Sequence, residues 1–218
     1  MNYKEIKELI AQGESTTLEF KRKIISPVKL AKELAAFANT KGGMLLIGVD
    51  DDGTVIGIES EKTAIELVGK ACGFFVDPPL QPKIEIVNLN WVDILLIEIP
   101  ESAKKPHYLV YDEEGEEVKQ PQRRAYIRVG DKSLIASREM SRLMKVQADD
   151  SKPLKLSIGD KEKRLFLYLE KHERATVKDF ARLVNISDRR AERLLIRLVR
   201  AGVIMIHVDN AADYFTLI

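Results

Sequence analysis

Arginines at helical spacing near the C-terminus are the residues of this sequence best placed to do chemistry. They recur at steps of three and four, as Arg189, Arg193, Arg197 and Arg200. Residues at those steps share one side of a helix, and the apolar stripe lies elsewhere, at Ala191, Leu194, Leu195, Leu198 and Val199. Arginines near the start of a helix reach guanine edges or phosphates in a major groove. The residues expected to bind nucleic acid here are Ser187, Arg189, Arg190, Arg193 and Arg197.

The elements around this helix predict a winged helix-turn-helix over residues 160–218. A first helix is expected over 160–171, and a second begins at Thr176, whose hydroxyl can cap it while Asp179 reaches back. The connection Asn185-Ile186-Ser187 is short, and Ser187 can cap the third helix. Apolar runs at 203–208 and 214–218 then predict the two strands of a hairpin. DNA contact is the favoured function of the basic helix, and protein contact or a merely solvated face is the alternative.

A break in periodicity divides the chain into two expected domains. Residues 148–159 lose helical spacing and collect Asp, Ser, Pro and Gly, which is typical of a linker. About 21 Lys and Arg stand against about 25 Asp and Glu in residues 1–150, and about 12 against about 9 from residue 160 onward. We expect an α+β domain at 1–147, a linker at 148–159, and the winged helix-turn-helix at 160–218.

The front domain intermixes helical and strand patterns. Helices are expected at 3–10, 28–39, 63–75 and 137–144, and strands at 17–21, 44–49, 55–58, 83–88, 92–99 and 125–129. In the first strand Leu18 and Phe20 point one way, and Glu19 points the other. The run from Met44 to Val49 is apolar throughout, so this strand should be central and covered on both faces.

Three motifs follow one another along the front domain. They are GESTTLEFK at 13–21, LAAFANTKGGMLLIGVDDDG at 34–53 and YIRVG at 126–130. Together they closely resemble the Schlafen AlbA-like family, and the resemblance spans most of residues 1–145. Family members that carry this domain before a winged helix are described as DNA-binding or transcriptional regulators. The resemblance therefore implies a regulator that binds duplex DNA through the winged helix, with the AlbA-like domain as a further nucleic-acid contact.

The same resemblance carries an alternative function. Similar domains in animal Schlafen proteins cleave structured RNA with acidic residues, and the matching positions are Glu14 and Glu19, with Asp50 or Asp52 as a third carboxylate. Carboxylates hold Mg²⁺ or Mn²⁺, and the metal activates water and neutralises charge on the phosphate. The alternative is thus a metal-dependent endoribonuclease, whereas the favoured binding function needs no cofactor. Consecutive aspartates before Gly53 are equally typical of a hairpin turn.

Basic residues beside the motifs could follow a nucleic-acid backbone. A groove that collects several of them would track phosphates, and the candidates are Lys21, Lys41, Arg124 and Arg128, with Arg22, Lys23 and Arg123 nearby. Gly42-Gly43 precedes a strand, where residues without a β-carbon allow a sharp turn. The sequence contains no Gly-x-x-x-x-Gly-Lys-Ser/Thr motif, so ATP binding is disfavoured.

Composition disfavours several other classes of protein. The 218 residues hold no stretch of eighteen apolar residues and the first ten are charged, so we expect a cytoplasmic protein with no membrane partner. The single cysteine, Cys72, has apolar neighbours and is expected to be buried. His107, His172 and His207 stand apart at no metal spacing. Because winged-helix regulators commonly read two half-sites, we expect a homodimer.

Overall fold

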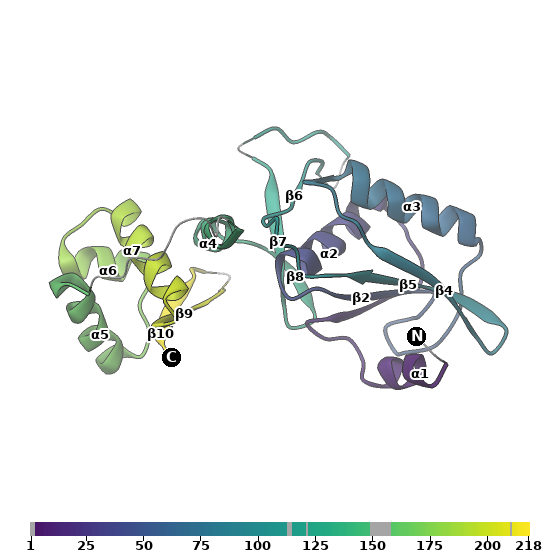
Figure 1. Ribbon diagram of the computed structural model, residues 1–218, viewed down its shortest axis with the longest axis horizontal. Coiled ribbons are helices and arrows are strands. Elements are labelled where there is room, and N and C mark those ends of the chain that lie inside the picture. The colour runs from purple at the N-terminus through teal and green to yellow at the C-terminus, as the bar shows by residue number, and fades with distance from the viewer. Residues whose placement is uncertain (1–2, 113–114, 121, 149–157, 210) are drawn as a thin grey trace. The chain divides into compact units, whose positions relative to one another are not determined.

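The chain folds into two compact units. The computed structural model describes residues 3–112, 115–120, 122–148, 158–209 and 211–218. The two units are Met1–Ile135 and Ala136–Ile218 (Figure 1). The division falls before helix α4 (Arg138–Ala148), whereas the sequence placed that helix in the front domain. Most of the expected linker, 148–159, lies outside the described residues.

The first unit is built on a sheet with strand order β1-β2-β5-β4. Strand β1 (Leu18–Lys21) runs parallel to β2 (Gly43–Ile47), and β5 (Val92–Ile99) pairs antiparallel with β2 and with β4 (Lys83–Leu89). Helices α2 (Pro27–Asn39) and α3 (Glu61–Phe74) supply the core on one face, and α1 (Tyr3–Ala11) supplies it on the other. The expected central strand is confirmed at β2, a placement that its unbroken apolar sequence allows.

Strand alternation sorts the core residues between the two faces of this sheet. Leu45 and Ile47 of β2 pack with α2 and α3, while Leu46, between them, packs with Ile6 and Phe20 on the α1 side. Successive side chains of a strand point to opposite faces. The predicted direction of Phe20 is therefore confirmed.

Helix α2 begins one residue before its predicted start and ends at Asn39, as predicted. The Ser26 side chain accepts a hydrogen bond from the backbone N–H of Lys29, and Pro27 opens the helix. At the far end Gly42 has a φ of +73°, and a β-carbon there would lie 2.7 Å from the backbone nitrogen of Glu101. The Gly42-Gly43 pair thus lets the chain turn closely into β2.

A second sheet packs against the same helix, in the order β3-β6-β7-β8. Its strands are β3 (Val76–Asp77), β6 (Tyr108–Leu109), β7 (Arg124–Val129) and β8 (Lys132–Ile135). The buried Asn39 side chain at the end of α2 donates to the carbonyls of His107 and Tyr126, both at 2.9 Å. Sequence periodicity found β7 but missed the other three strands. The strand predicted at 55–58 is wrong, because the described segment makes an isolated bridge from Val49 to Val55 instead.

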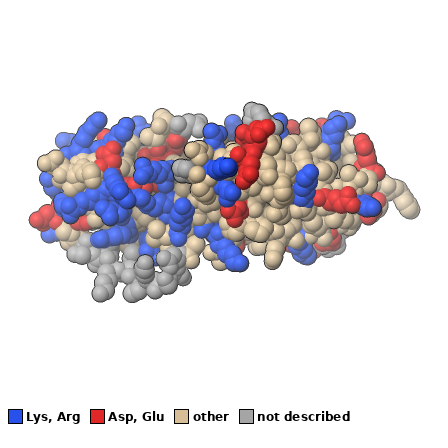
Figure 2. Space-filling view, turned by 90° about the horizontal axis from the view of Figure 1, so that it is seen from above, with Lys and Arg blue, Asp and Glu red and all other residues tan. Residues whose placement is uncertain are grey.

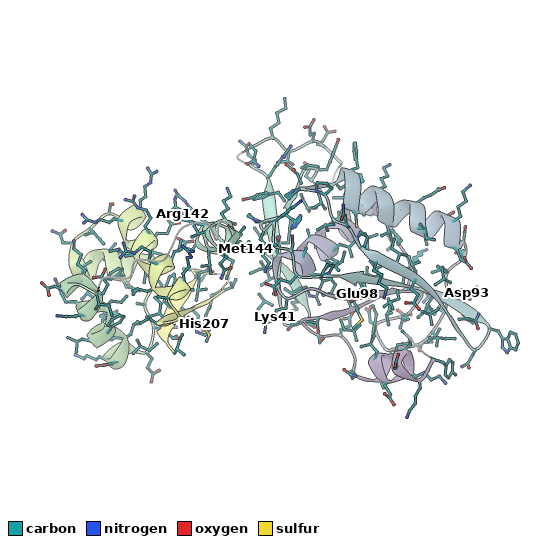
Figure 3. The ribbon with its side chains drawn as sticks, viewed as in Figure 1. Lys41, Asp93, Glu98, Arg142, Met144 and His207 are labelled. Atoms are coloured by element: carbon teal, nitrogen blue, oxygen red, sulfur yellow. The ribbon has the colours of Figure 1, made fainter. Side chains whose placement is uncertain are left out.

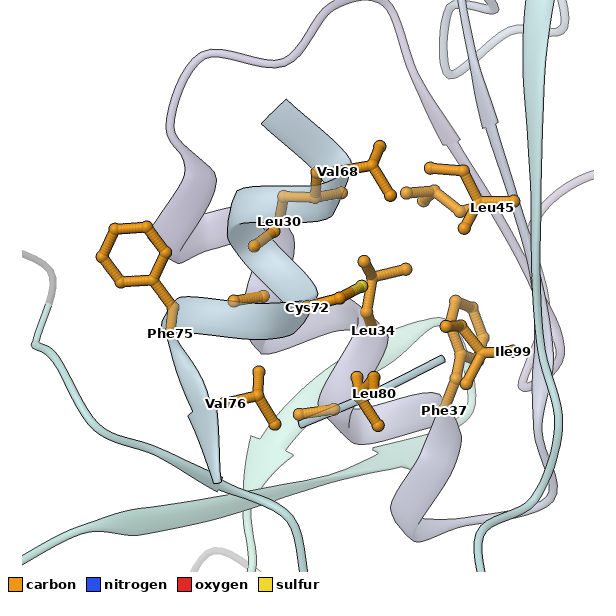
Figure 4. Packing of buried hydrophobic residues seen from close by; sticks show 14 of the residues in the cluster. Leu30, Leu34, Phe37, Leu45, Val68, Cys72, Phe75, Val76, Leu80 and Ile99 are labelled. Carbon is orange, nitrogen blue, oxygen red and sulfur yellow. The ribbon is translucent and has the colours of Figure 1, made fainter. Parts of the chain in front are cut away.

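Cys72 lies inside the first unit, as expected. Its side chain packs in the cluster between α2 and α3 beside Leu34 and Val68 (Figure 4). Burial raises the pKa of the Cys72 thiol to about 12, which keeps it protonated and unreactive at neutral pH. The thiol is therefore a structural residue.

The second unit contains α4, three further helices and a hairpin. The helices are α5 (Asp160–His172), α6 (Val177–Val184) and α7 (Asp188–Arg200). Strand β9 (Ile204–His207) pairs antiparallel with β10 (Tyr214–Leu217). Leu165, Phe180, Leu195 and Phe215 come from different elements and share one core. The helices and strands expected between residues 160 and 218 are all present.

Candidate nucleic-acid interface

A tight connection between α6 and α7 fixes where α7 starts. Thr176 caps α6 as predicted, since its hydroxyl oxygen accepts from the N–H of Asp179 at 3.2 Å and its own N–H donates to the Asp179 carboxylate at 2.9 Å. Asn185 then adopts a left-handed conformation with a φ of 52°, which asparagine tolerates well. Three residues, 185–187, thus connect α6 to α7, which begins at Asp188.

The predicted cap at Ser187 is wrong in its chemistry. Ser187 occupies the N-cap position, but among the described residues its side chain accepts no cap hydrogen bond. The backbone carbonyl of Ser187 instead accepts from the N–H groups of Arg190 and Ala191. The exposed hydroxyl stays at the start of α7, where a nucleic-acid contact was expected.

Helix α7 has one buried face and one basic face. Ala191, Leu195 and Leu198 lie in the core of the unit, as the apolar stripe predicted. On the other side Arg189, Arg190 and Arg193 are exposed, whereas Arg197 and Arg200 are half-buried. The visible face of this unit is crowded with Lys and Arg side chains (Figure 2). The exposed arginines of α7 all come from its first half.

An acidic residue on α7 is held away from the basic face. Glu192 is buried and forms an ion pair with Arg142 of α4. Figure 3 labels the Arg142 side chain on α4. Burial of a carboxylate is costly unless a cation compensates it, and Arg142 of α4 supplies that cation for Glu192. This pair was not expected from the sequence, because α4 was assigned to the front domain.

The hairpin is anchored to the rest of the second unit at two points. Ala175 and Phe215 exchange backbone hydrogen bonds of 3.0 and 2.8 Å, which adds a bridge beside β10. The Ser137 hydroxyl, which also caps α4, donates to the Asp213 carboxylate. Burial raises the pKa of Asp213, and this hydrogen bond offsets part of the rise. The loop between the strands is thereby tied to α4.

The acidic residues of the nuclease alternative each have a structural partner. Glu14 accepts from the N–H of Phe20 at 2.9 Å, and Glu19 is buried beside Lys21 and Arg128. Two of the aspartates are likewise occupied: the Asp50 carboxylate lies 3.2 Å from Arg22, and the Asp52 carboxylate accepts from the N–H of Thr54 at 2.8 Å.

Those acids do not fit a shared metal ion in this structure. Burial, with the charges of Glu19 and Asp51 adding to it, raises the pKa of Glu14, so Glu14 and Glu19 do lie near one another. Within the part of the chain that the structure describes, however, no group of three or more His, Cys, Asp or Glu is placed to hold a metal. The expected trio of Glu14, Glu19 and Asp50 or Asp52 is therefore not assembled.

Arg128 is not a surface cation, contrary to expectation. Its side chain is 0% exposed, and one guanidinium nitrogen lies 2.9 Å from Glu19 and 3.2 Å from Glu33. The other terminal nitrogen donates to the carbonyl of Ser15 at 2.8 Å. The guanidinium also lies 4.9 Å above the ring of Phe37. Arg128 joins β7 to β1 and α2, and no face of it is left for a phosphate in this conformation.

The other basic candidates of the first unit remain near the surface. Lys21 is partly exposed and pairs with Glu19, while Lys41 and Arg124 are exposed. Two neighbouring hollows run beside α2, and both are lined by Lys29 and Lys32. These two lysines were not among the residues expected from the sequence, although their spacing of three residues places them on the same side of the helix.

The geometry defines an α+β unit with basic hollows, followed by a helical unit with an arginine-lined helix. A family model for the Schlafen AlbA_2 domain matches residues 14–137, and the chain belongs to this family. The family suggests nucleic-acid binding. No helix in the described ranges is long and apolar enough to cross a membrane.

Two solved structures resemble the chain in part. The DIP2311 protein from Corynebacterium diphtheriae is 21% identical over 62% of this chain, with a TM-score of 0.44. The match covers 31% of that protein, so this chain spans less than a third of its length. The other is the N-terminal domain of a protein from Nitrosomonas europaea described as related to the ATP-dependent DNA helicase RecG. It is 14% identical, covers 63% of this chain and 96% of its own, and has a TM-score of 0.39.

Proposed function

We propose that the chain is a DNA-binding transcriptional regulator whose residues 160–218 form a winged helix-turn-helix. The observation that carries the proposal is the pair of opposite faces of α7, with Arg189, Arg190 and Arg193 exposed and its apolar face buried. The order of helix, helix, short turn, helix and hairpin is the order that a winged helix requires. Helix α7 is the recognition helix of this proposal.

The position of the arginines suits a major groove. Recognition helices contact base edges with their N-terminal residues, and the exposed arginines of α7 lie within its first six residues, from Asp188 to Arg193. A guanidinium can donate two parallel hydrogen bonds to guanine or bind phosphate. Arg182 and Lys178 on α6 are also exposed, and they could contact the backbone that the preceding helix of such a motif crosses.

The AlbA-like unit is proposed to add contacts to nucleic acid, through Lys21, Lys41 and Arg124 rather than through buried Arg128.

We further propose that the protein acts in the cytoplasm as a homodimer, which would read two half-sites with two-fold symmetry. Light scattering at micromolar concentration measures the mass of the particle in solution, and the mass of a monomer would contradict the dimer.

A binding assay on duplex DNA tests the recognition helix. The double variant Arg189→Ala/Arg193→Ala should weaken binding, because both side chains point away from the core and their loss removes contacts without a cavity. If both arginines contact phosphate, the dependence of log affinity on log salt should flatten by about 1.8, at about 0.9 per contact. If one reads a base, sequence preference should relax instead.

A second double variant in the same unit is the control for the loss of positive charge alone. Lys163 and Lys171 are exposed on α5, so Lys163→Ala/Lys171→Ala removes two positive charges away from α7. This control should bind duplex DNA nearly as the wild type does. Equal affinity of the Arg189→Ala/Arg193→Ala variant and the wild type would refute the assignment of α7.

A further inference from the structure

A hollow of about 420 Å³ lies beside α2, and of its lining residues the function proposed above uses Arg124 alone. Lys29 and Lys32 of α2 line it on one side, and Arg124 and Tyr126 of β7 line it on another. Tyr111, which follows β6, completes the wall. Its volume is within the range of pockets that hold small ligands.

The hollow carries more positive than negative charge. Lys29 and Arg124 are exposed, and neither has an ion-pair partner among the residues that the structure describes. The ammonium of Lys32 lies 3.9 Å from Glu33 and 5.8 Å from the ring centroid of Tyr126. The acid in the lining, Asp112, accepts the N–H of Glu116 at 2.8 Å. An anion is therefore favoured, and phosphate is the anion that clustered Lys and Arg commonly bind.

An aromatic ring stands beside these cations and is already fixed in place. Tyr111 stacks on Phe74 with ring centroids 5.1 Å apart and 25° between the planes, and Phe75 meets it edge-on at 5.1 Å. Phe74 is itself 55% exposed although it is a large apolar residue. A ring held by its neighbours loses little freedom when a planar ligand stacks on it.

We propose that this hollow binds a nucleotide of a single-stranded nucleic acid. Its base would stack on Tyr111, whose ring Phe74 and Phe75 hold in place, and its phosphates would lie at Lys29, Lys32 and Arg124. Cations that track the backbone beside aromatic rings that stack bases are the combination by which proteins hold single strands. A base inside a duplex is covered by its neighbours and cannot present its face to a ring, so the pair of features favours a single strand over a duplex.

The inference rests on the proposed binding of nucleic acid and assigns a different strand form to each unit. In these proposals duplex DNA binds α7 of the second unit, and single-stranded nucleic acid binds the hollow of the first unit. The assignments of α7 and of the hollow use different residues, and the contact proposed above for Arg124 belongs to the hollow and its single strand. They can therefore fail separately.

Fluorescence anisotropy with the full chain tests the hollow. The probes are labelled oligothymidine, labelled oligouridine and a labelled DNA duplex. Tyr111→Leu should weaken binding of the single strands by about tenfold, the scale of one base stack on an aromatic ring. Lys29→Ala/Arg124→Ala should flatten their salt dependence by about 1.4, at about 0.7 per phosphate contact on a single strand. Duplex affinity should stay at the wild-type value for both variants.

Two control variants change the same chemistry elsewhere in the first unit. Lys62→Ala removes an exposed positive charge at the opposite end of α3 from Phe74, and Trp91→Ala removes an aromatic side chain that is 96% exposed at a hairpin tip. Both should bind the single strands as the wild type does. Far-ultraviolet circular dichroism confirms that each variant is folded, and the lysine and arginine variant, being a surface change, keeps the test valid if Tyr111→Leu unfolds.

The outcomes separate the two proposals. Duplex binding without single-strand binding overturns the hollow and leaves the recognition helix standing. Single-strand binding that is insensitive to Tyr111, Lys29 and Arg124 but lost with Arg189 and Arg193 also overturns it, because the strand would then lie on α7. Single-strand binding that both hollow variants weaken supports the hollow, even if the duplex does not bind.

Discussion

Replacing the buried Arg128 should lower the stability of the first unit more than replacing an exposed residue does. In Arg128→Met the buried carboxylate of Glu19 and the half-buried carboxylate of Glu33 lose the guanidinium that lies 2.9 and 3.2 Å away. Methionine fills much of the volume, so the loss is one of charge and hydrogen bonds rather than of packing. The Ser15 carbonyl also loses its donor.

The magnitude follows from the burial of the ion pairs. Removing one partner of a buried pair costs about 3 to 5 kcal/mol, because the remaining charge loses most of its compensation. Glu19 would keep only its pair with the partly exposed Lys21. The unfolding entropy of a unit the size of Met1–Ile135 is about 280 cal/mol/K, at about 2.1 cal/mol/K per residue. The midpoint of thermal unfolding of this unit should therefore fall by about 11 to 18 °C.

Differential scanning calorimetry of the full chain measures this shift. Arg124→Met is the matched control, since Arg124 lies on the same strand but is exposed, and it should change stability by less than about 0.5 kcal/mol. Adding Glu19→Gln to Arg128→Met should recover part of the loss, because the buried carboxylate that has lost its arginine is no longer charged. An Arg128→Met midpoint within about 3 °C of the control would refute the reasoning.

Three further predictions concern acids and a cap. Burial raises the pKa of Asp213 above 3.8, so protonated Asp213 stabilises the folded state fully below pH 3.8, and this stabilisation is lost as pH rises through the raised pKa. In urea unfolding, the free energy of unfolding of Asp213→Asn should therefore rise relative to that of the wild type between acid and neutral pH. A difference that does not change with pH would contradict this. Thr176→Ala removes the α6 cap and should cost about 1 kcal/mol in the same assay, whereas a cost under about 0.3 kcal/mol would mean that the cap is unimportant. Glu14→Gln keeps an acceptor for the N–H of Phe20 and should leave the affinity for duplex DNA unchanged. Gels with Mn²⁺ should show no cleavage of structured RNA by the wild type or by the variant. If the wild type cleaves RNA and the variant does not, Glu14 is catalytic after all.

Local patterns in the sequence predicted most of the elements. The Thr176 and Asp179 capping box, the apolar stripe of α7 and the unbroken run of β2 all appear where spacing placed them. These features depend on residues within one or two turns of each other or on one strand, so their signal is complete in a short window. The exposed arginines of α7 follow from the same periodicity, which is why that part of the candidate interface could be predicted.

Short strands were beyond the reach of periodicity. Strands β3 and β6 have two residues each, Val76–Asp77 and Tyr108–Leu109, and no alternation can be read from two positions. Their pairing is decided by partners far along the chain, such as Tyr108 with Ala125. The hollow beside α2 went unseen for the same reason, because Lys29, Tyr111 and Arg124 meet only after the second sheet forms.

The sequence by itself determined the family, the helices and the basic face of α7, since each is written in neighbouring residues. Tertiary structure decided which charged residues stay available for binding. Arg128 is a charged residue of the YIRVG motif and was expected to contact phosphates, yet the packing of α2 and β1 against β7 buries it between two carboxylates. Glu192 looks like a surface acid, yet Arg142 of α4 pairs with it in the interior. Whether a charge binds solvent, ligand or another side chain depends on its burial and partners, and these arise from contacts between distant segments.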